Sequence, residues 1–401
     1  MSEMSYLEKL LDGVEVEWLP LGEVSALRRG RVMSKGYLTE NFGPYPVYSS
    51  QTANNGKIGS INTFDFDGEY ISWTTDGANA GTVFYRTGKF SITNVCGLIT
   101  LKSKYSLIYK FLFYWLTIEA KKHVYSGMGN PKLMSHQVEN IPVPIPCPDN
   151  PEKSLAIQSE IVRILDKFTA LTAELTAELN MRKKQYNYYR DQLLSFDESS
   201  VEWKTLLEAC DYVDYRGKTP KKTQSGIFLV TAKNIRMGYI DYHASQEFIS
   251  EEDYAIVMRR GLPKKGDVLI TTEAPCGFVA QVNRENIALA QRVIKYRSKN
   301  TQLSNSFLKH YLLGSQFQDK LMQAATGSTV KGIKGSRLHQ LKIPIPSKVE
   351  QDRIVAILDK FDTLTNSITE GLPREIELRQ KQYEYYRDLL FSFPTPETVS
   401  N

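Results

Sequence analysis

The sequence predicts an α+β fold with a pseudo-two-fold internal repeat, in which two mixed, strand-rich domains are separated by two long helices that form an antiparallel coiled coil. Three observations predict it. The chain has 401 residues, too many for one ordinary core. The same ordered set of motifs occurs twice, and each copy ends in an apolar stripe with helical spacing. We therefore expect domains at 1–150 and 201–346, and helical segments at 151–200 and 347–401.

The repeat consists of four motifs that recur in the same order. Each copy opens with VEW, continues through a variable block to a proline-rich joint, and closes with two helical signatures. Beyond this shared layout the sequences of the two blocks differ widely, so each half is one scaffold with its own binding surface. The pairs are VEW (16–18 and 201–203), HQVENIPVPIP and HQLKIPIP (136–146 and 339–346), QSEIVRILDKF and QDRIVAILDKF (158–168 and 351–361), and RKKQYNYYRDQLLSF and RQKQYEYYRDLLFSF (182–196 and 379–393).

The two helical signatures belong to long helices. Apolar residues recur three and four positions apart from Ile161 onwards, which places them on one face for a partner helix. No proline follows Pro151 until after Phe196, so one helix of about 43 residues, roughly 65 Å at 1.5 Å per residue, is expected there. In the second copy Gly371-Leu372-Pro373 should kink or interrupt the helix, because proline removes a hydrogen bond.

The variable blocks are predicted to be strand-rich, each with one helix. Segments rich in β-branched and aromatic residues, bounded by glycine or polar turns, predict the strands. An apolar stretch before a glycine-bearing loop predicts the helix in each block. The expected strand segments are 69–75, 81–86, 90–101, 266–272 and 278–282, and the expected helices are 107–123 and 305–323.

Charge is distributed unevenly along the chain. Residues 16–146 hold 13 Lys/Arg against 9 Asp/Glu, and residues 201–346 hold 22 against 13, so the two variable blocks carry +4 and +9. The segments between and after them are close to neutral. A solvated surface of mixed charge would account for this, but two basic blocks are also typical of a protein that meets a polyanion twice.

Other features of composition exclude several classes of protein. No apolar run approaches the roughly 18 residues of a membrane span, and the first residues lack the layout of a signal peptide, so we expect a soluble, cytoplasmic protein with no membrane partner. The four cysteines lie far apart without a CxxC pair, which predicts reduced, mostly buried residues and no metal site.

Motifs for catalysis or cofactor binding are incomplete wherever they begin. Gly217-Lys218-Thr219 resembles the end of a phosphate-binding loop, but Tyr212 stands where that loop needs its first glycine. Asn130-Pro131 resembles the start of an adenine-methyltransferase motif but lacks the following proline and aromatic residue. Asp267 and Glu273 suggest nuclease carboxylates, yet no Glu-x-Lys follows. We expect no catalytic, cofactor-binding or metal-binding residues.

The whole layout resembles the specificity subunit of type I restriction-modification enzymes. Two variable domains alternate with helices carrying QxxIVxILDKF and KQYxYYRD, each helix introduced by an IPxP joint, and the tandem TAEL units at 172–179 resemble the type IC subfamily. The resemblance implies a non-catalytic subunit whose domains each read one half of a bipartite, asymmetric target in double-stranded DNA. It also implies that the helices set the unread gap and dock two methyltransferase subunits.

The resemblance further implies the cofactors of the complex, which lie outside this chain. Adenine methylation would use S-adenosylmethionine bound by the methyltransferase subunits. Two restriction subunits would add cleavage and translocation driven by ATP with Mg. This chain is expected to bind none of the three.

Candidate DNA-binding residues are cationic and amide side chains in the predicted loops, because phosphates need donors and base edges need paired hydrogen bonds. In the first block they are Arg28, Arg29, Arg31, Lys35, Gln51, Asn54, Asn55, Lys57 and Lys132. In the second block they are Lys218, Lys221, Lys222, Lys233, Asn234, Arg236, Gln291, Arg292, Lys331 and Lys334.

Two competing hypotheses remain at this stage. A coiled-coil scaffold with incidental basic domains would bind DNA weakly and without sequence preference. A fused methyltransferase-nuclease recognition half would need the catalytic motifs that are missing. The tyrosines at 186–189 and 383–386 could stack on bases, but their helical spacing favours packing or methyltransferase docking.

Overall fold

The computed structural model describes residue 10 and residues 13–127, 129–215, 220–367 and 369–394. The chain forms two compact units. Unit 1 comprises Met1–Ala173 with Leu378–Asn401, and unit 2 comprises Glu174–Glu377. Both boundaries between the units fall inside helices, at Ala173–Glu174 and at Glu377–Leu378.

Unit 1 is built on a six-stranded sheet in the order β2-β7-β5-β6-β3-β4, with β3 parallel to β6. The predicted segment 90–101 is two strands, because β6 ends at Ile92 and the chain turns before β7 begins at Cys96. The strands are β2 (Ser25–Arg29), β3 (Phe42–Tyr48), β4 (Lys57–Ile61), β5 (Phe66–Thr74), β6 (Val83–Ile92) and β7 (Cys96–Leu101). The helices and turns are α2 (Leu21–Val24), α3 (Lys35–Glu40), η1 (Ala53–Gly56), α4 (Tyr109–Glu119), η2 (Ala120–His123) and α5 (Ser135–Val138).

Unit 2 contains two four-stranded sheets, β10-β17-β14-β15 and β11-β13-β12-β16, and β12 is parallel to β16. The predicted helix 305–323 is wrong as a single element. It divides into α9 (Asn305–Leu313) and α10 (Ser315–Ala324), because Gly314 adopts an extended conformation with φ −68° and ψ 149°. The strands are β10 (Cys210–Asp214), β11 (Lys222–Thr223), β12 (Ile227–Val230), β13 (Phe248–Ile249), β14 (Val268–Thr272), β15 (Cys276–Gln281), β16 (Ile287–Leu289) and β17 (Val293–Ser298). The other helices are α7 (Leu206–Ala209), α8 (Glu251–Val257), η3 (Met258–Arg260) and α11 (Gly335–Leu338).

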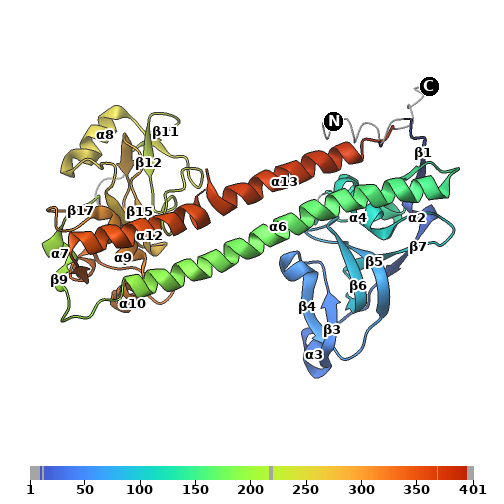
Figure 1. Ribbon diagram of the computed structural model, residues 1–401, viewed down its shortest axis with the longest axis horizontal. Coiled ribbons are helices and arrows are strands. Elements are labelled where there is room, and N and C mark those ends of the chain that lie inside the picture. The colour runs from blue at the N-terminus through green and yellow to red at the C-terminus, as the bar shows by residue number, and fades with distance from the viewer. Residues whose placement is uncertain (1–9, 11–12, 128, 216–219, 368, 395–401) are drawn as a thin grey trace. The chain divides into compact units, whose positions relative to one another are not determined.

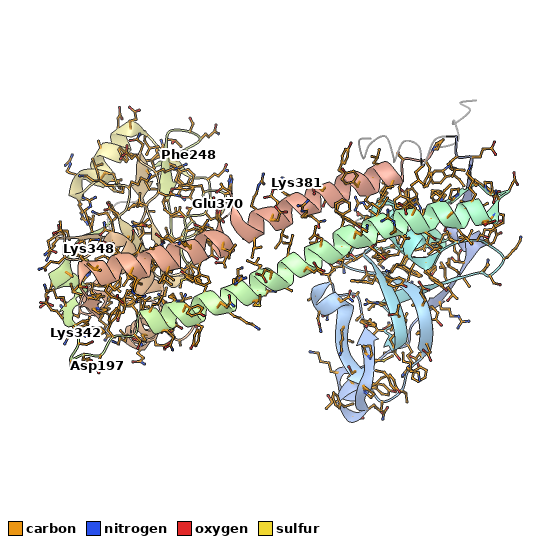
Figure 2. All side chains as sticks on the ribbon, viewed as in Figure 1. Asp197, Phe248, Lys342, Lys348, Glu370 and Lys381 are labelled. Atoms are coloured by element: carbon orange, nitrogen blue, oxygen red, sulfur yellow. The ribbon has the colours of Figure 1, made fainter. Side chains whose placement is uncertain are left out.

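The VEW and IPxP motifs pair with each other in both units. In unit 1, β1 (Val16–Pro20) runs antiparallel to β8 (Pro142–Pro146), with Trp18 opposite Pro144. In unit 2, β9 (Glu202–Thr205) pairs with β18 (Lys342–Ile345), with Trp203 opposite Pro344. Both partners of a two-stranded ribbon are edge strands, so prolines are tolerated there. Each two-stranded pair closes its domain where the chain enters and leaves it. Lys342, labelled in Figure 2, marks the first residue of β18 in the second pair.

The first long helix has the predicted length. α6 (Pro151–Leu193) spans 43 residues without interruption, as Figure 1 shows. The second helix is interrupted, as predicted from Gly371-Leu372-Pro373, and forms α12 (Lys348–Asn366) and α13 (Gly371–Leu390). A side chain at Gly371, where φ is +81°, would meet the Thr363 carbonyl oxygen at 2.4 Å, so only glycine fits.

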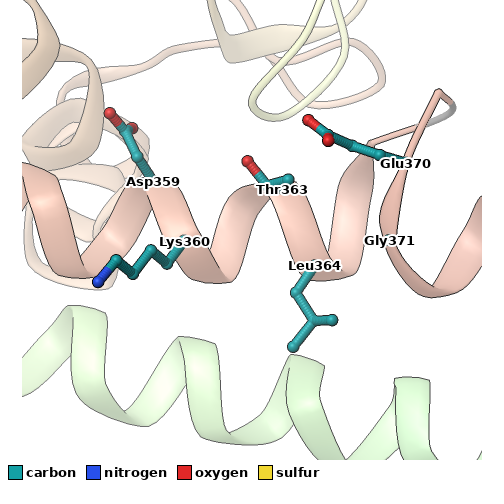
Figure 3. A pocket seen from close by; sticks show the side chains of 6 residues that line it. All are labelled: Asp359, Lys360, Thr363, Leu364, Glu370 and Gly371. Atoms are coloured by element: carbon teal, nitrogen blue, oxygen red, sulfur yellow. The ribbon is translucent and has the colours of Figure 1, made fainter.

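An open pocket lies at this interruption. Figure 3 shows Leu364 pointing towards α6, whereas Asp359 and Glu370 point away from it. The pocket is lined by Asp359, Lys360, Thr363, Leu364, Glu370 and Gly371.

Within each unit the long helices pack through aromatic rings, and Figure 1 shows α6 antiparallel to α13 in unit 1 and to α12 in unit 2. Phe168 stacks on Tyr386 with centroids 5.3 Å apart in unit 1. Phe361 stacks on Tyr186 and Tyr189 at 6.0 and 5.8 Å in unit 2. The DKF phenylalanine of one copy therefore meets tyrosines of the KQYxYYRD motif of the other, which confirms a packing role for Tyr186, Tyr189 and Tyr386.

The described residues contain no helix that is long and apolar enough to cross a membrane. Cys96, Cys210 and Cys276 are buried and Cys147 is partly buried, as predicted. In the same residues no cluster of His, Cys, Asp and Glu is arranged to hold a metal ion.

Candidate nucleic-acid interface

Several loops of unit 1 meet at one end of its sheet. Arg31 follows β2 and hydrogen-bonds through its backbone to Ile92 (3.3 Å) and Asn94 (3.1 Å) in the turn after β6. Ser49, which follows β3, contacts Thr93 of the same turn through hydroxyl groups 2.9 Å apart. The carbonyl of its neighbour Ser50 accepts from Asn79, at 3.5 Å, in the hairpin between β5 and β6. Four connecting segments that are far apart in sequence therefore lie side by side.

The glycine-bearing loop before α5 joins the same end. The Leu133 amide donates to the Thr75 carbonyl at 2.9 Å, and the Gly77 amide donates to Pro131 at 3.0 Å. The Arg29 guanidinium reaches both the Asn94 carbonyl (3.3 Å) and the Met134 sulfur (3.5 Å). We call this surface the loop end of unit 1, formed by residues 29–31, 49–57, 76–81, 93–95, 126–127 and 129–134.

Most candidates of the first block are presented at this end. Arg29, Asn54, Asn55 and Lys132 are exposed there, and Gln51 and Lys57 are partly exposed. Arg28 on β2 and Lys35 at the start of α3 are also exposed but lie outside these segments. Two candidates already have partners inside the unit. Arg31 pairs with Asp65 at 3.0 Å, and hydrogen bonds with Tyr37 and then Asp65 raise the pKa of Arg31. The Gln51 amide donates to the Lys57 carbonyl at 2.6 Å, so it also shapes the loop.

Unit 2 places matching segments in matching positions. The Thr272 amide donates to the Arg292 carbonyl and the Ile333 amide donates to the Thr272 carbonyl, each at 2.9 Å. Thr75 makes the same pair of bonds in unit 1, to Val95 and Leu133. Arg292 therefore occupies the position of Val95, and the loop 326–334 occupies that of 125–134. Lys331 and Lys334 are exposed in this loop, and Gln291 is partly exposed beside it.

The loop 231–236 corresponds to the loop 49–57. The Ala290 amide donates to Val230 at 2.9 Å, as the Thr93 amide donates to Tyr48 at 2.9 Å, after equivalent parallel strands. Lys233 is exposed on this loop, and Arg236 is partly exposed and lies 3.6 Å from Asp241. Corresponding loops of the two units thus carry the candidate side chains.

Asn234 requires a correction. Its side chain is fully buried, and its amide oxygen accepts from the Thr231 amide and hydroxyl at 3.0 and 2.9 Å. Its amide nitrogen donates to the carbonyls of Asp241 (2.9 Å) and Ser245 (2.8 Å). With every donor and acceptor of its side chain used, Asn234 ties the loop 231–236 to the segment that follows it and does not present an amide to a base.

Two candidates of unit 2 lie at an edge strand and not on these loops. Lys221 and Lys222 are exposed at the edge strand β11, which β13 separates from β12. Lys222 pairs with Glu247 at 2.8 Å, and Arg292 lies 3.6 Å from Glu273. Lys218 lies outside the described residues.

Sequence analysis missed two segments of the loop end. The hairpin 76–81 and the turn 93–95 contribute backbone to it, yet neither was a candidate. The Asp76-Gly77 pair between two strand-like runs is a hairpin signal that could have identified the first segment. The turn 93–95 has no comparable signal, because its part depends on pairing with Arg31 and Ser49, far away in sequence.

The carboxylate considered for nuclease chemistry has a structural role. Asp267 is 1% exposed and receives two hydrogen bonds of 2.6 Å from the Arg297 guanidinium, with Lys295 at 3.9 Å. These bonds to Asp267 raise the pKa of Arg297, and burial lowers the pKa of Lys295. A carboxylate neutralised in this way holds β14 to β17.

Comparisons with known proteins agree with the internal repeat. A family model described as the type I restriction modification DNA specificity domain matches twice, at residues 13–182 and 203–378. The specificity subunit of the type I restriction enzyme EcoR124I/EcoR124II of Escherichia coli is 44% identical, covering all of both chains. That of EcoprrI, also from Escherichia coli, is 38% identical and covers 92% of this chain and 93% of the relative. A crystal structure of the S subunit from M. genitalium shares the fold with a TM-score of 0.58 and 17% identity, over 96% of this chain and 98% of that one.

Proposed function

The chain belongs to the family of type I restriction-modification DNA specificity subunits, and from this premise we propose that each unit reads one half of a bipartite, asymmetric DNA target through its loop end. The observation that carries the proposal is the correspondence between the two units. Both present matching loops on the same scaffold, while the side chains on those loops differ. One scaffold with two different reading surfaces suits a target whose halves differ in sequence.

The exposed side chains at the loop ends have suitable chemistry for this task. Lys132, Lys233 and Lys331 can each donate to a phosphate, which fixes position on the duplex without reading sequence. Asn54 and Asn55 can offer the paired donor and acceptor that an adenine edge requires in the major groove. Asn234 is not part of this proposal, since its amide is satisfied internally.

The remaining subunits of the enzyme supply the chemistry. We infer two methyltransferase subunits that bind S-adenosylmethionine and two restriction subunits that use ATP and Mg, all acting in the cytoplasm. Tyr188 and Tyr385 support two equivalent docking sites, because they occupy the same position in the two helical repeats and are 62% and 55% exposed. The tandem TAEL units favour the type IC subfamily.

A domain exchange tests the proposed function. Replacing residues 20–140 with the matching segment of a relative, in a chain co-purified with its methyltransferase subunit, should change one half of the target and leave the other intact. Methylation mapping on plasmid DNA measures the outcome. The chain alone is the control and should neither methylate, cleave nor hydrolyse ATP. A change in both halves together would contradict independent readers, and methylation without any sequence preference would favour the non-specific scaffold.

A second prediction separates phosphate contacts from base contacts at the loop end of unit 1. Lys132→Ala should weaken DNA binding for all sequences and reduce the slope of log K against log salt concentration by about 1. Asn55→Ala should instead reduce discrimination at one base of the half-site. Lys104→Ala is the matched control, because Lys104 is exposed near the opposite end of β7. Titration of the complex with target and mutated DNA at several salt concentrations measures both effects; equal slopes for Lys132→Ala and Lys104→Ala would contradict the prediction.

A further inference from the structure

A buried cation lies directly beneath the loop 49–57. Arg86 of β6 is only 3% exposed, and its guanidinium lies over the rings of Tyr48 and Phe84, at 3.6 and 4.4 Å from their centroids. It donates to the Ser72 hydroxyl at 3.0 Å and to the Asn55 carbonyl at 2.8 Å. Within the described chain no carboxylate forms an ion pair with it. Burial lowers the pKa of Arg86 to about 10, so the group is still charged at neutral pH.

The loop that Arg86 contacts has an unusual backbone. Asn54 and Asn55 are consecutive and exposed, and both are left-handed, with φ of +50° and +52°. Asparagine tolerates this conformation better than other non-glycine residues, but usually as a single residue, so two in succession indicate that the surroundings hold the loop. The ends of the loop are tied by the Ser49 amide, which donates to Gly56 at 2.9 Å, and by the Gln51 bond to Lys57. The Arg86 bond fastens its tip.

We propose that Arg86 is a positioning residue for DNA recognition by unit 1: it fixes the left-handed Asn54-Asn55 tip from beneath, so that the two amides face the DNA in one orientation. The inference rests on the proposed function of the loop end. An apolar side chain of similar size could fill the space between Tyr48 and Phe84 without the cost of burying a charge. What the guanidinium adds is a rigid donor at the Asn55 carbonyl and a positive charge below a surface that meets phosphates.

The corresponding loop of unit 2 supports this inference. There the buried Asn234 holds the loop 231–236 with two hydrogen bonds from Thr231 within the loop and two to the carbonyls of Asp241 and Ser245 beyond it. Both units therefore fix the same loop with a buried polar side chain, but the side chain and its geometry differ. A recognition loop that is fixed before binding loses less conformational entropy on binding and discriminates more sharply between bases.

The test uses the complete complex of specificity and methyltransferase subunits. Arg86→Met keeps the volume and removes the donor and the charge. Gly56→Ala acts on the Arg86 guanidinium from the loop side, because its added Cβ would lie 3.0 Å from Nη2, the nitrogen next to the one that donates to Asn55, at a residue with φ of +80°. Ser72→Ala is the matched control, since it removes the other hydrogen bond of Arg86 and leaves the bond to Asn55 in place.

We expect Arg86→Met and Gly56→Ala to reduce discrimination in the half-site read by unit 1 by roughly tenfold at one or more base pairs. The half-site read by unit 2 should be unchanged, and Ser72→Ala should retain both half-sites. Methylation profiling on a randomised target library gives the two half-sites separately, and thermal unfolding reports stability.

An unchanged unit 1 half-site in folded Arg86→Met complex would overturn the inference. If Arg86→Met unfolds unit 1, the folded Gly56→Ala variant is the test. An unchanged unit 1 half-site in that variant would also overturn the inference. Failure of the proposed function has a different signature: exchange of residues 20–140 would then leave the target unchanged even though the complex methylates DNA.

Discussion

Gln158→Ala is expected to destabilise unit 1 by about 2–3 kcal/mol, because it leaves buried backbone groups without partners. The fully buried Gln158 side chain accepts from the Ile108 amide at 2.9 Å and donates to the Ser106 carbonyl at 2.8 Å, where the chain enters α4. Alanine at this position can replace neither bond. Urea unfolding followed by hydrogen exchange at residues 105–112 measures the loss.

Gln351→Ala should have the same effect on unit 2, because Gln351 accepts from the Ser304 amide at 2.8 Å and donates to the Gln302 carbonyl at 2.7 Å. Gln192→Ala is the control. Gln192 is exposed near the end of α6, and its loss should change stability by no more than about 0.5 kcal/mol. If Gln158→Ala were no more destabilising than Gln192→Ala, the glutamine would not be an anchor between helix and domain.

The aspartate of the repeated ILDKF motif completes this anchor. Asp166 accepts from the Tyr114 hydroxyl and pairs with Lys110, both at 2.6 Å. In unit 2, Asp359 accepts from His310 at 2.7 Å and lies 3.4 Å from Lys309, and the His310 hydrogen bond lowers the pKa of Asp359. The repeated motif thus recurs because each copy must fasten its own domain to a helix, in addition to packing against the other helix.

The local features of this fold could be predicted from the sequence, whereas the non-local ones could not. The absence of proline after Pro151 sets the length of α6, and Gly371 with Pro373 sets the interruption, because each acts on its own backbone. The pairing of VEW with IPxP depends on segments more than 120 residues apart and leaves no local signal.

The candidate site shows the same division. Loops rich in Lys, Asn and Gln were identifiable as polar surfaces, and most of their side chains are exposed. The inward orientation of the Asn234 side chain was not predictable. An asparagine in a turn either hydrogen-bonds to nearby backbone groups or faces solvent, and tertiary contacts determine which. The burial of Arg86 was not predictable either, because the sequence around a single arginine in a strand does not indicate that a loop covers it.

The length of the helical spacer leads to the prediction with the largest effect on the target. Tyr186 follows Phe168 by 18 positions in the first copy, and Tyr383 follows Phe361 by 22 positions in the second. The spacing between the two signatures therefore differs by four residues. The same number of residues, 367–370, lies between α12 and α13. The interruption therefore accounts for the extra length, and the TAEL units of α6 remain one continuous helix with Leu175 and Leu179 partly buried.

A third TAEL unit should preserve the packing of this helix and lengthen it. Four residues turn an α-helix by about 400°, so the apolar stripe returns to within about 40° of its former face. The same insertion adds roughly 6 Å along the helix, against about 3.4 Å per base pair of DNA. That rise corresponds to nearly two base pairs for a helix parallel to the DNA axis, and tilt reduces it towards one.

We therefore expect the three-unit form to read both half-sites unchanged across an unread gap that is wider by one or two base pairs. Removing one unit should narrow the gap or abolish activity. A five-residue insertion is the control, because it turns the stripe by about 140° from its partner and should abolish methylation. Methylome sequencing of cells carrying each form decides the matter: an unchanged gap in the three-unit form would show that α6 does not set the distance between the two readers.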